Sequence, residues 1–256
     1  MSLEYAPRGL IGVLTPQANT TVEPEFNLLL PLGVAMITAR LTSSKTSLTE
    51  RLADYFASYG DTLRQFANAP IKAFAAACTG ASYLAGRDRE AMLVKEISAR
   101  SGVPFITAAL AVVDALKLLR ARSVGLVSPY PADLARASIG YWESHGFEIA
   151  KVVEVSASVQ GFHPIYEISG VATAQALQSL HDSPLDAIVM LGTGTPTLLS
   201  ITEAIEWNRA PVLSCNLALA WRAVEALDGQ SPRSTTLEMW LRGDHWLQQF
   251  RVRQQR

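Results

Sequence analysis

Short, continuous apolar runs recur along the chain and are separated by segments with helical periodicity. Continuous apolar runs of this length are typical of parallel strands that are buried on both faces. They predict strands at residues 10–14, 34–38, 71–77, 104–107, 124–127, 149–155, 187–191 and 212–214. The alternation of strands and helices predicts an α/β fold with doubly wound parallel sheets.

Helix start signals mark several of the segments between the predicted strands. Ser47 and Glu50 have the spacing of a capping box, in which a serine side chain and a glutamate three residues later satisfy free N–H groups. Thr20 and Glu23 have the same spacing and predict a second helix start. Pro131 suits the first position of a helix, so a helix is expected to run from there to about residue 145.

Three segments of the chain occur twice in the same order. Residues 12–16 (Gly-Val-Leu-Thr-Pro) are echoed by residues 125–129 (Gly-Leu-Val-Ser-Pro), and residues 104–107 by residues 211–214. Between these, Cys78-Thr79-Gly80 is echoed by residues 192–194, Gly-Thr-Gly. The spacings agree, since 78 − 16 = 62 and 192 − 129 = 63. We therefore predict two pseudo-symmetric, Rossmann-like domains, formed by residues 1–108 plus 217–256 and by residues 109–216.

The repeat also predicts the place of a ligand site. Ligands of open α/β sheets bind beyond the carboxyl ends of the strands. Two facing domains would bring residues 16–21, 78–82, 129–131 and 192–195 around one cleft. These segments are rich in Gly, Thr, Ser and Asn, whose N–H and hydroxyl groups suit a carboxylate. The sequence therefore predicts a small anionic substrate.

Composition excludes several other classes of protein. The formal net charge of −1 gives no overall field for nucleic acid. No apolar run reaches the length of a membrane span, and residues 1–8 lack the apolar core of a signal peptide. Two distant cysteines do not form a disulfide framework. The four histidines lack the spacing of metal ligands, so we expect a cytoplasmic protein without a metal site.

Residues 16–26, Pro-Gln-Ala-Asn-Thr-Thr-Val-Glu-Pro-Glu-Phe, together with Cys78-Thr79 and Tyr130, resemble a known family. It is the maleate cis–trans isomerase and arylmalonate decarboxylase branch of the aspartate/glutamate racemase superfamily, and the resemblance extends to about residue 227. It implies two pseudo-symmetric α/β domains, no cofactor, and one cysteine from each domain on opposite faces of a small dicarboxylate substrate. Cys78 matches the first cysteine position. Gly192 occupies the second, so this chain departs from the two-thiol pattern.

The repeat and the resemblance together give a set of site residues. Cys78 is the expected catalytic residue, and a thiol at a helix N-terminus is expected to have a lowered pKa. The substrate-binding residues are expected to be Pro16, Asn19, Thr79, Gly80, Tyr130, Gly192, Thr193 and Gly194. Cys215, Asn216 and His163 are further candidates, for which core packing or a solvated loop is the alternative interpretation.

Three functions stay open from the sequence. The first is a cofactor-independent enzyme that isomerises or decarboxylates a small dicarboxylate through Cys78. The second is a racemase or epimerase in which a group other than cysteine serves the Gly192 face; proteins of this type also occur in catabolic pathways such as ectoine use. The third is a non-catalytic carboxylate-binding protein. Leu237, Leu241, Leu247 and Phe250 predict a C-terminal amphipathic helix that packs on the domain or on another subunit, and we expect a homo-oligomer.

Overall fold

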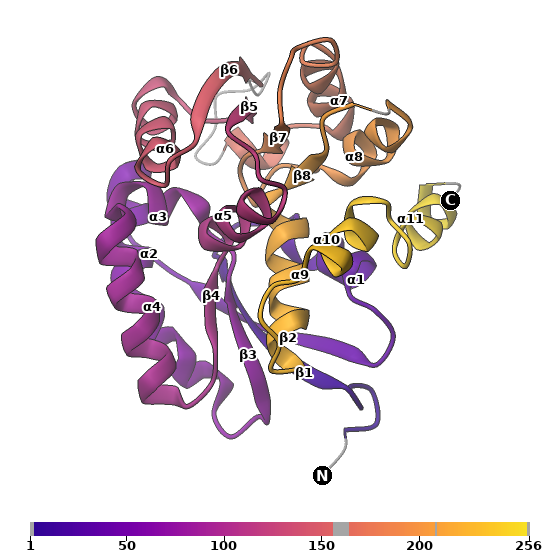
Figure 1. The fold of residues 1–256 in the computed structure, drawn as a ribbon. Coiled ribbons are helices and arrows are strands. Elements are labelled where there is room, and N and C mark those ends of the chain that lie inside the picture. The colour runs from indigo at the N-terminus through magenta and orange to yellow at the C-terminus, as the bar shows by residue number, and fades with distance from the viewer. Residues whose placement is uncertain (1–2, 156–163, 208, 255–256) are drawn as a thin grey trace.

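The computed structural model describes residues 3–155, 164–207 and 209–254. It contains two separate four-stranded parallel sheets, in the strand orders β2-β1-β3-β4 and β6-β5-β7-β8 (Figure 1). The two orders are equivalent, so each half of the repeat forms one sheet. The prediction of two similar doubly wound α/β units is therefore confirmed, and each of the eight predicted strands is present within a few residues of its expected bounds.

The first sheet is formed by the N-terminal part of the chain. Its strands are β1 (Gly9–Pro16), β2 (Val34–Leu41), β3 (Ile71–Ala76) and β4 (Phe105–Thr107). The helices between them are α1 (Val22–Leu29), α2 (Leu48–Thr62), the 3-10 turn η1 (Leu63–Phe66), α3 (Thr79–Ala85) and α4 (Arg87–Ser101). Every residue of β1 is buried, as expected for a central strand covered on both faces.

The second sheet repeats this arrangement. Its strands are β5 (Ser123–Ser128), β6 (Glu148–Glu154), β7 (Ala187–Met190) and β8 (Val212–Ser214). The helical segments between them are α6 (Ala132–Ser144), η2 (Pro164–Glu167), α7 (Gly170–Gln178), α8 (Leu198–Ala204) and η3 (Ile205–Trp207). β7 is buried along its whole length and lies between β5 and β8, as β3 lies between β1 and β4.

Two helices pack against each other between the sheets: α5 (Ala108–Leu118), which follows β4, and α9 (Cys215–Leu227), which follows β8 (Figure 1). Both are apolar on most sides, as is typical of helices buried in a core. Helix α9 also packs on β1, β3 and β4 of the first sheet. This contact supports placing residues 217–256 with residues 1–108, although those domain boundaries stay a prediction.

The helix starts follow the sequence signals in part. Ser47 is the N-cap of α2, and its Oγ accepts the Glu50 N–H at 3.2 Å, as the capping box predicts. The prediction for Thr20 and Glu23 is wrong, because Thr21 is the N-cap of α1 and the Asn19 side chain accepts the free N–H groups instead. Pro131 is the N-cap of α6 rather than its first residue.

The C-terminal segment differs from the single amphipathic helix that was predicted. It forms two short helices, α10 (Ser234–Leu241) and α11 (Leu247–Gln254), with Gly243 at a φ of +75° between them. Leu237 and Phe250 are buried, and the His245 ring nitrogen Nε2 lies 2.9 Å from the Leu29 carbonyl oxygen. The segment therefore packs on its own chain. In the described part of the chain, no helix has the length and apolar character needed to cross a membrane.

Candidate active site

Cys78 lies two residues beyond the end of β3, where it is the N-cap residue of α3. Its side chain is only 4% exposed. The hydroxyl of Tyr59 on α2 donates to the Cys78 carbonyl oxygen at 3.3 Å, which ties the loop to the neighbouring helix. The thiol is thus held at the carboxyl end of the first sheet, as the sequence predicts.

Three hydrogen bonds join the repeated loops across the two sheets. Thr79 Oγ1 lies 2.8 Å from the Tyr130 hydroxyl, and Thr193 Oγ1 donates to the Ala77 carbonyl oxygen at 2.8 Å. Thr21 Oγ1 donates to the Gly194 carbonyl oxygen, also at 2.8 Å. The threonine after each repeated strand therefore reaches the opposite domain. The structure brings the predicted loops together, with Cys78, Tyr130 and Thr193 close to one interface.

The electrostatics of the thiol differ from the expectation. Burial raises the pKa of Cys78 to about 12, and a hydrogen bond from the Ala81 N–H only partly offsets this effect. The predicted lowering of this pKa by the helix N-terminus is therefore wrong. Desolvation outweighs one backbone donor because the charged form of a thiol loses its water on burial. At neutral pH, Cys78 is a neutral thiol and carries a proton that it can donate.

The Asn-Thr-Thr run that carries the family resemblance shapes the loop after β1. The Pro16 carbonyl oxygen accepts the Asn19 N–H at 3.0 Å. Asn19 Oδ1 in turn accepts the N–H groups of Thr21 and Val22, at 2.9 and 3.0 Å. Its other side-chain atom, Nδ2, lies 3.5 Å from Thr193 Oγ1 of the second domain. Asn19 thus orders the loop with its oxygen and points its amide donor toward the domain interface.

Glu25, at the end of the same run, docks the two domains. Its buried carboxylate accepts the Thr197 N–H at 2.6 Å and the Leu198 N–H at 3.3 Å, both at the start of α8. It also accepts a hydrogen bond from Asn216 Nδ2 at 2.7 Å, and the same nitrogen donates to the Thr193 carbonyl oxygen at 3.1 Å. Burial raises the pKa of Glu25, and these donors oppose the rise. Asn216 therefore positions the Thr193 loop.

Two of the predicted site glycines allow close packing. A Cβ atom on Gly80 would lie 2.9 Å from a methyl carbon of Leu52, so the glycine lets α3 approach α2. A Cβ atom on Gly194 would collide with the ring of Tyr166. These glycines thus set the distance between elements, and Gly194 seats an aromatic ring that the sequence analysis did not identify.

Gly192 is the equivalent of Cys78 in the second copy of the repeat, and it adopts a φ of +86°. Residues other than glycine adopt this region only at a cost in free energy, because their Cβ atom approaches the backbone too closely. A Cβ atom there would lie 2.9 Å from Pro129 Cγ, 2.9 Å from Thr195 Oγ1 and 3.1 Å from Ile165 Cδ1. None of these three neighbours is a base at neutral pH. Among the described side chains, those nearest to an added Cβ at Gly192 are therefore packing neighbours.

We expect Gly192→Ala to lower the free energy of unfolding by about 2–5 kcal/mol, the sum of a positive-φ cost and an overpacking cost. Gly146→Ala is the matched control, because Gly146 has a φ of +90° with no atom within 4 Å of the added Cβ. It should cost only about 1–2 kcal/mol. For the same reason, Gly192→Cys should lose stability without gaining racemase activity. Urea denaturation of both alanine variants checks the difference, and equal losses would contradict it.

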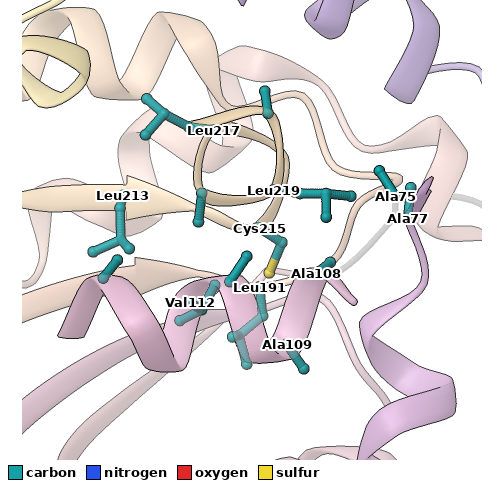
Figure 2. Close-up of a cluster of buried hydrophobic side chains, with 14 of the residues drawn as sticks. Ala75, Ala77, Ala108, Ala109, Val112, Leu191, Leu213, Cys215, Leu217 and Leu219 are labelled. Carbon is teal, nitrogen blue, oxygen red and sulfur yellow. The ribbon is translucent and has the colours of Figure 1, made fainter. Parts of the chain in front are cut away.

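Cys215 lies in the apolar core between the domains. It is fully buried, and Figure 2 shows its sulfur among Ala108, Leu191 and other apolar side chains. The thiol donates to the Met190 carbonyl oxygen at 3.5 Å, and burial raises its pKa to about 12. The apolar neighbours and the Met190 contact favour the alternative interpretation of Cys215 as a packing residue. The Gly192 N–H and the Thr79 hydroxyl also lie within hydrogen-bonding range of its sulfur and oppose the rise in its pKa, so Cys215 borders the Thr79–Tyr130 pair. His163 lies outside the described residues, so its candidate role stays a prediction.

A group of polar side chains near Cys78 was missed by sequence reasoning. Arg51, Tyr55 and Tyr59 come from α2, and Tyr166 comes from η2 of the second domain. Burial raises the pKa of each of these three tyrosines, and the charge of the Cys78 thiolate would raise it further. Among the residues that the structure describes, no group of three or more His, Cys, Asp or Glu side chains could hold a metal ion.

Known proteins that are similar to this chain in sequence and fold include maleate isomerases. The maleate isomerase of Nocardia farcinica is 29% identical over 229 residues, which cover 85% of this chain and 90% of that protein. A solved structure of a Nocardia farcinica maleate cis–trans isomerase mutant, with a covalently bound succinylcysteine intermediate, is 28% identical with a TM-score of 0.76. The match covers 86% of this chain and 93% of that chain. A Pseudomonas putida maleate isomerase structure, 22% identical with a TM-score of 0.77 over 86% and 93% of the two chains, shares the fold.

The family model described as arylmalonate decarboxylase matches residues 11–237. This range includes both sheets, the loops that carry Asn19, Cys78, Tyr130 and Gly192, and helix α9. The resemblance inferred from the Asn-Thr-Thr run and Cys78 is thereby confirmed. With the two sheets in equivalent strand order and the repeated loops joined at one interface, the chain belongs to the arylmalonate decarboxylase family.

Proposed function

We propose that this protein is a cofactor-independent cis–trans isomerase of a small unsaturated dicarboxylate, with Cys78 as its nucleophile. The observation that carries the proposal is the single thiol at the end of β3, with a glycine at the equivalent position after β7. The covalent succinylcysteine in the 28% identical relative supports a thiol addition in this fold. Maleate is the substrate named for that relative, and it is the first compound to test here.

In the proposed reaction, the Cys78 sulfur bonds to one alkene carbon and the π electrons move to the neighbouring carbon. The thiol proton is transferred to that carbon, which leaves a succinyl group on the sulfur. Rotation about the new single bond brings the carboxylates to the trans arrangement. A proton then passes from the neighbouring carbon to the sulfur as the carbon–sulfur bond breaks, so the alkene re-forms and the thiol is restored. All atoms balance, so the step requires no oxidant, reductant or cofactor.

The raised pKa of Cys78 favours a second candidate, the decarboxylation of a substituted malonate. In this reaction the bond to one carboxyl group breaks, CO₂ leaves, and its bonding electrons form an enediolate. The neutral Cys78 thiol then donates its proton to the carbon from one face, and water returns a proton to the sulfur. One proton donor is enough for this chemistry. Two-base racemisation instead needs a second group, and the described side chains nearest to an added Gly192 Cβ, those of Pro129, Thr195 and Ile165, supply none. The Gly192 N–H lies within hydrogen-bonding range of the Cys215 sulfur, but burial raises the pKa of that thiol to about 12.

Proton NMR of the protein with maleate, a substituted malonate and aspartate, each in deuterated water, tests these functions. Formation of fumarate is the expected result. Loss of CO₂ from the malonate without turnover of maleate would replace the isomerase by the decarboxylase, and exchange at the aspartate α-carbon would favour a racemase. Saturable binding of maleate without any reaction would indicate a carboxylate-binding protein. A cytoplasmic location and a homo-oligomeric state stay predictions.

Tyr130→Phe tests the carboxylate contact on the Thr79 side. Burial raises the pKa of Tyr130 well above its usual value, so its hydroxyl stays a neutral donor. Removing this donor should reduce the stabilisation of the transition state by about 1–3 kcal/mol, which lowers kcat/KM for maleate roughly 5- to 150-fold. Steady-state kinetics measure the change. Unchanged affinity and unchanged turnover would place Tyr130 outside the site.

A further inference from the structure

One face of α2 directs three buried polar side chains toward the candidate thiol. Arg51, Tyr55 and Tyr59 are spaced by four residues, so they lie above one another on the helix surface. Arg51 is 2% exposed and Tyr55 is 3% exposed. Tyr59 contacts the Cys78 carbonyl oxygen. Because α2 follows β2, its N-terminal turns lie at the carboxyl end of the first sheet, the same end at which Cys78 lies after β3.

Tyr55 supplies an unused hydrogen-bond donor in this row. Its hydroxyl is buried and has no hydrogen-bond partner in the described part of the chain. Besides burial, Cys78 raises its pKa and Arg51 lowers it, so the hydroxyl is within electrostatic reach of both the thiol and the guanidinium. A buried polar atom without a partner costs about 1–3 kcal/mol. A hydroxyl kept at this cost beside a reactive thiol points to a ligand as its partner.

Tyr166 faces the same groups from the second domain. Its ring packs on Gly194, near Asn19 Nδ2. Burial raises the pKa of Tyr166, Cys78 and Tyr55 raise it further, and Arg51 lowers it. The same thiol, phenol and guanidinium therefore act on it from across the interface. Neutral phenols and a guanidinium supply O–H and N–H donors, which together suit an anion.

The loop before α2 fixes the charged groups of this cluster. Arg51 Nη1 donates to the Thr46 carbonyl oxygen at 2.5 Å and lies 3.5 Å from that of Lys45. The neighbouring carboxylate, Asp54, accepts the Ser43 hydroxyl at 2.5 Å, which holds its negative charge on the loop. The guanidinium is therefore ordered in place. A planar, permanently charged group held in this way is well suited to bind a carboxylate.

We propose that Arg51 and Tyr55, with Tyr166 opposite them, bind the second carboxylate of the substrate, while Tyr130 and Thr79 bind the first. The inference rests on the proposed function, because it assigns a subsite of the same cleft. With these two subsites, the expected substrate is a dianion that carries one carboxylate on each side of the reacting carbons. Monocarboxylates and half-amides of the same size are expected to be poor ligands.

Calorimetric titration with succinate and with its half-amide, succinamate, tests the subsite without turnover. The wild type should bind succinate at least about tenfold more tightly than succinamate, and Tyr55→Phe should reduce succinate affinity by about tenfold. The melting temperature of Tyr55→Phe should stay the same or rise, because the lost hydroxyl has no hydrogen-bond partner among the residues that the structure describes. Arg51→Gln should weaken succinate binding at least as much, with partial recovery in Arg51→Lys.

Tyr141→Phe is the matched control, because its buried hydroxyl donates to Glu90 at 2.5 Å instead. It should lower stability and leave the preference for succinate over succinamate unchanged. Unchanged succinate affinity in Tyr55→Phe, or a wild type that binds no succinate, would overturn the subsite. If Tyr55→Phe loses affinity but the wild type leaves maleate unreacted, the subsite stands and the isomerase proposal fails. The two proposals are thus separable.

Discussion

Cys78→Ser is expected to lower kcat for maleate by roughly a thousandfold or more. A serine hydroxyl is a weaker acid and a weaker nucleophile than a thiol, so both proposed uses of Cys78 fail together. The melting temperature should change little, because the substitution exchanges one small side chain for another. Rates from proton NMR and a thermal melt of the same preparation measure both quantities.

Cys215→Ala is the control for this result. Cys215 is the other free cysteine and is also buried, but its sulfur packs in the apolar cluster of Figure 2. Its loss should cost about 1 kcal/mol of stability or more through the cavity that it leaves, and turnover should be retained. Loss of activity in Cys215→Ala, with activity retained in Cys78→Ser, would reverse the assignment of the catalytic thiol.

Glu25→Ala is expected to have the largest effect on stability, about 3–5 kcal/mol. The substitution leaves the buried N–H groups of Thr197 and Leu198, and the side-chain amide of Asn216, without their acceptor. Since Asn216 also holds the Thr193 loop, kcat should fall as well. A fall in melting temperature of about 10 °C is expected for a chain of this size.

Glu23→Ala is a matched control on the same helix. Glu23 is partly exposed and pairs with Arg40, so its removal should cost at most about 1 kcal/mol. Denaturant unfolding of both variants gives the comparison. If the two substitutions cost the same, Glu25 does not dock the domains, and the Glu25 contacts with α8 contribute nothing to the folded state.

The fold could be predicted because the apolar pattern is unambiguous. Runs such as residues 71–77 are too short for a buried helix and too apolar for an exposed strand, so they specify parallel strands. The repeat of Thr-Gly after two of these strands placed Cys78 and Gly192 at equivalent positions. The capping box at Ser47 has a local cause and was correct. The Thr20 signal failed because α1 begins at Val22 with Thr21 as its N-cap, and the Asn19 side chain accepts the N–H groups of Thr21 and Val22.

The sequence predicted those site residues whose position depends on a single loop, and missed those whose role depends on contacts between distant segments. The thiol pKa depends on the burial of Cys78 by both domains, which no local motif reports. Tyr55 lies on the buried face of α2, and helical periodicity alone does not reveal that its hydroxyl lacks a partner among the described residues. The spacing of Arg51, Tyr55 and Tyr59 was the available signal. Tyr166 had none, because its role depends on Gly194, 28 residues later in the chain.

The most direct test of the account is a crystal structure of the Cys78→Ser variant with maleate. We predict that maleate lies between the two domains with an alkene carbon in contact with the substituted side chain. One carboxylate should bind the Tyr130 hydroxyl and the other should bind Arg51 and Tyr55. Maleate bound elsewhere, for example in the groove lined by Leu28, Val252 and Arg253, with the interface beside residue 78 unoccupied, would contradict Cys78 as the catalytic thiol of a dicarboxylate isomerase.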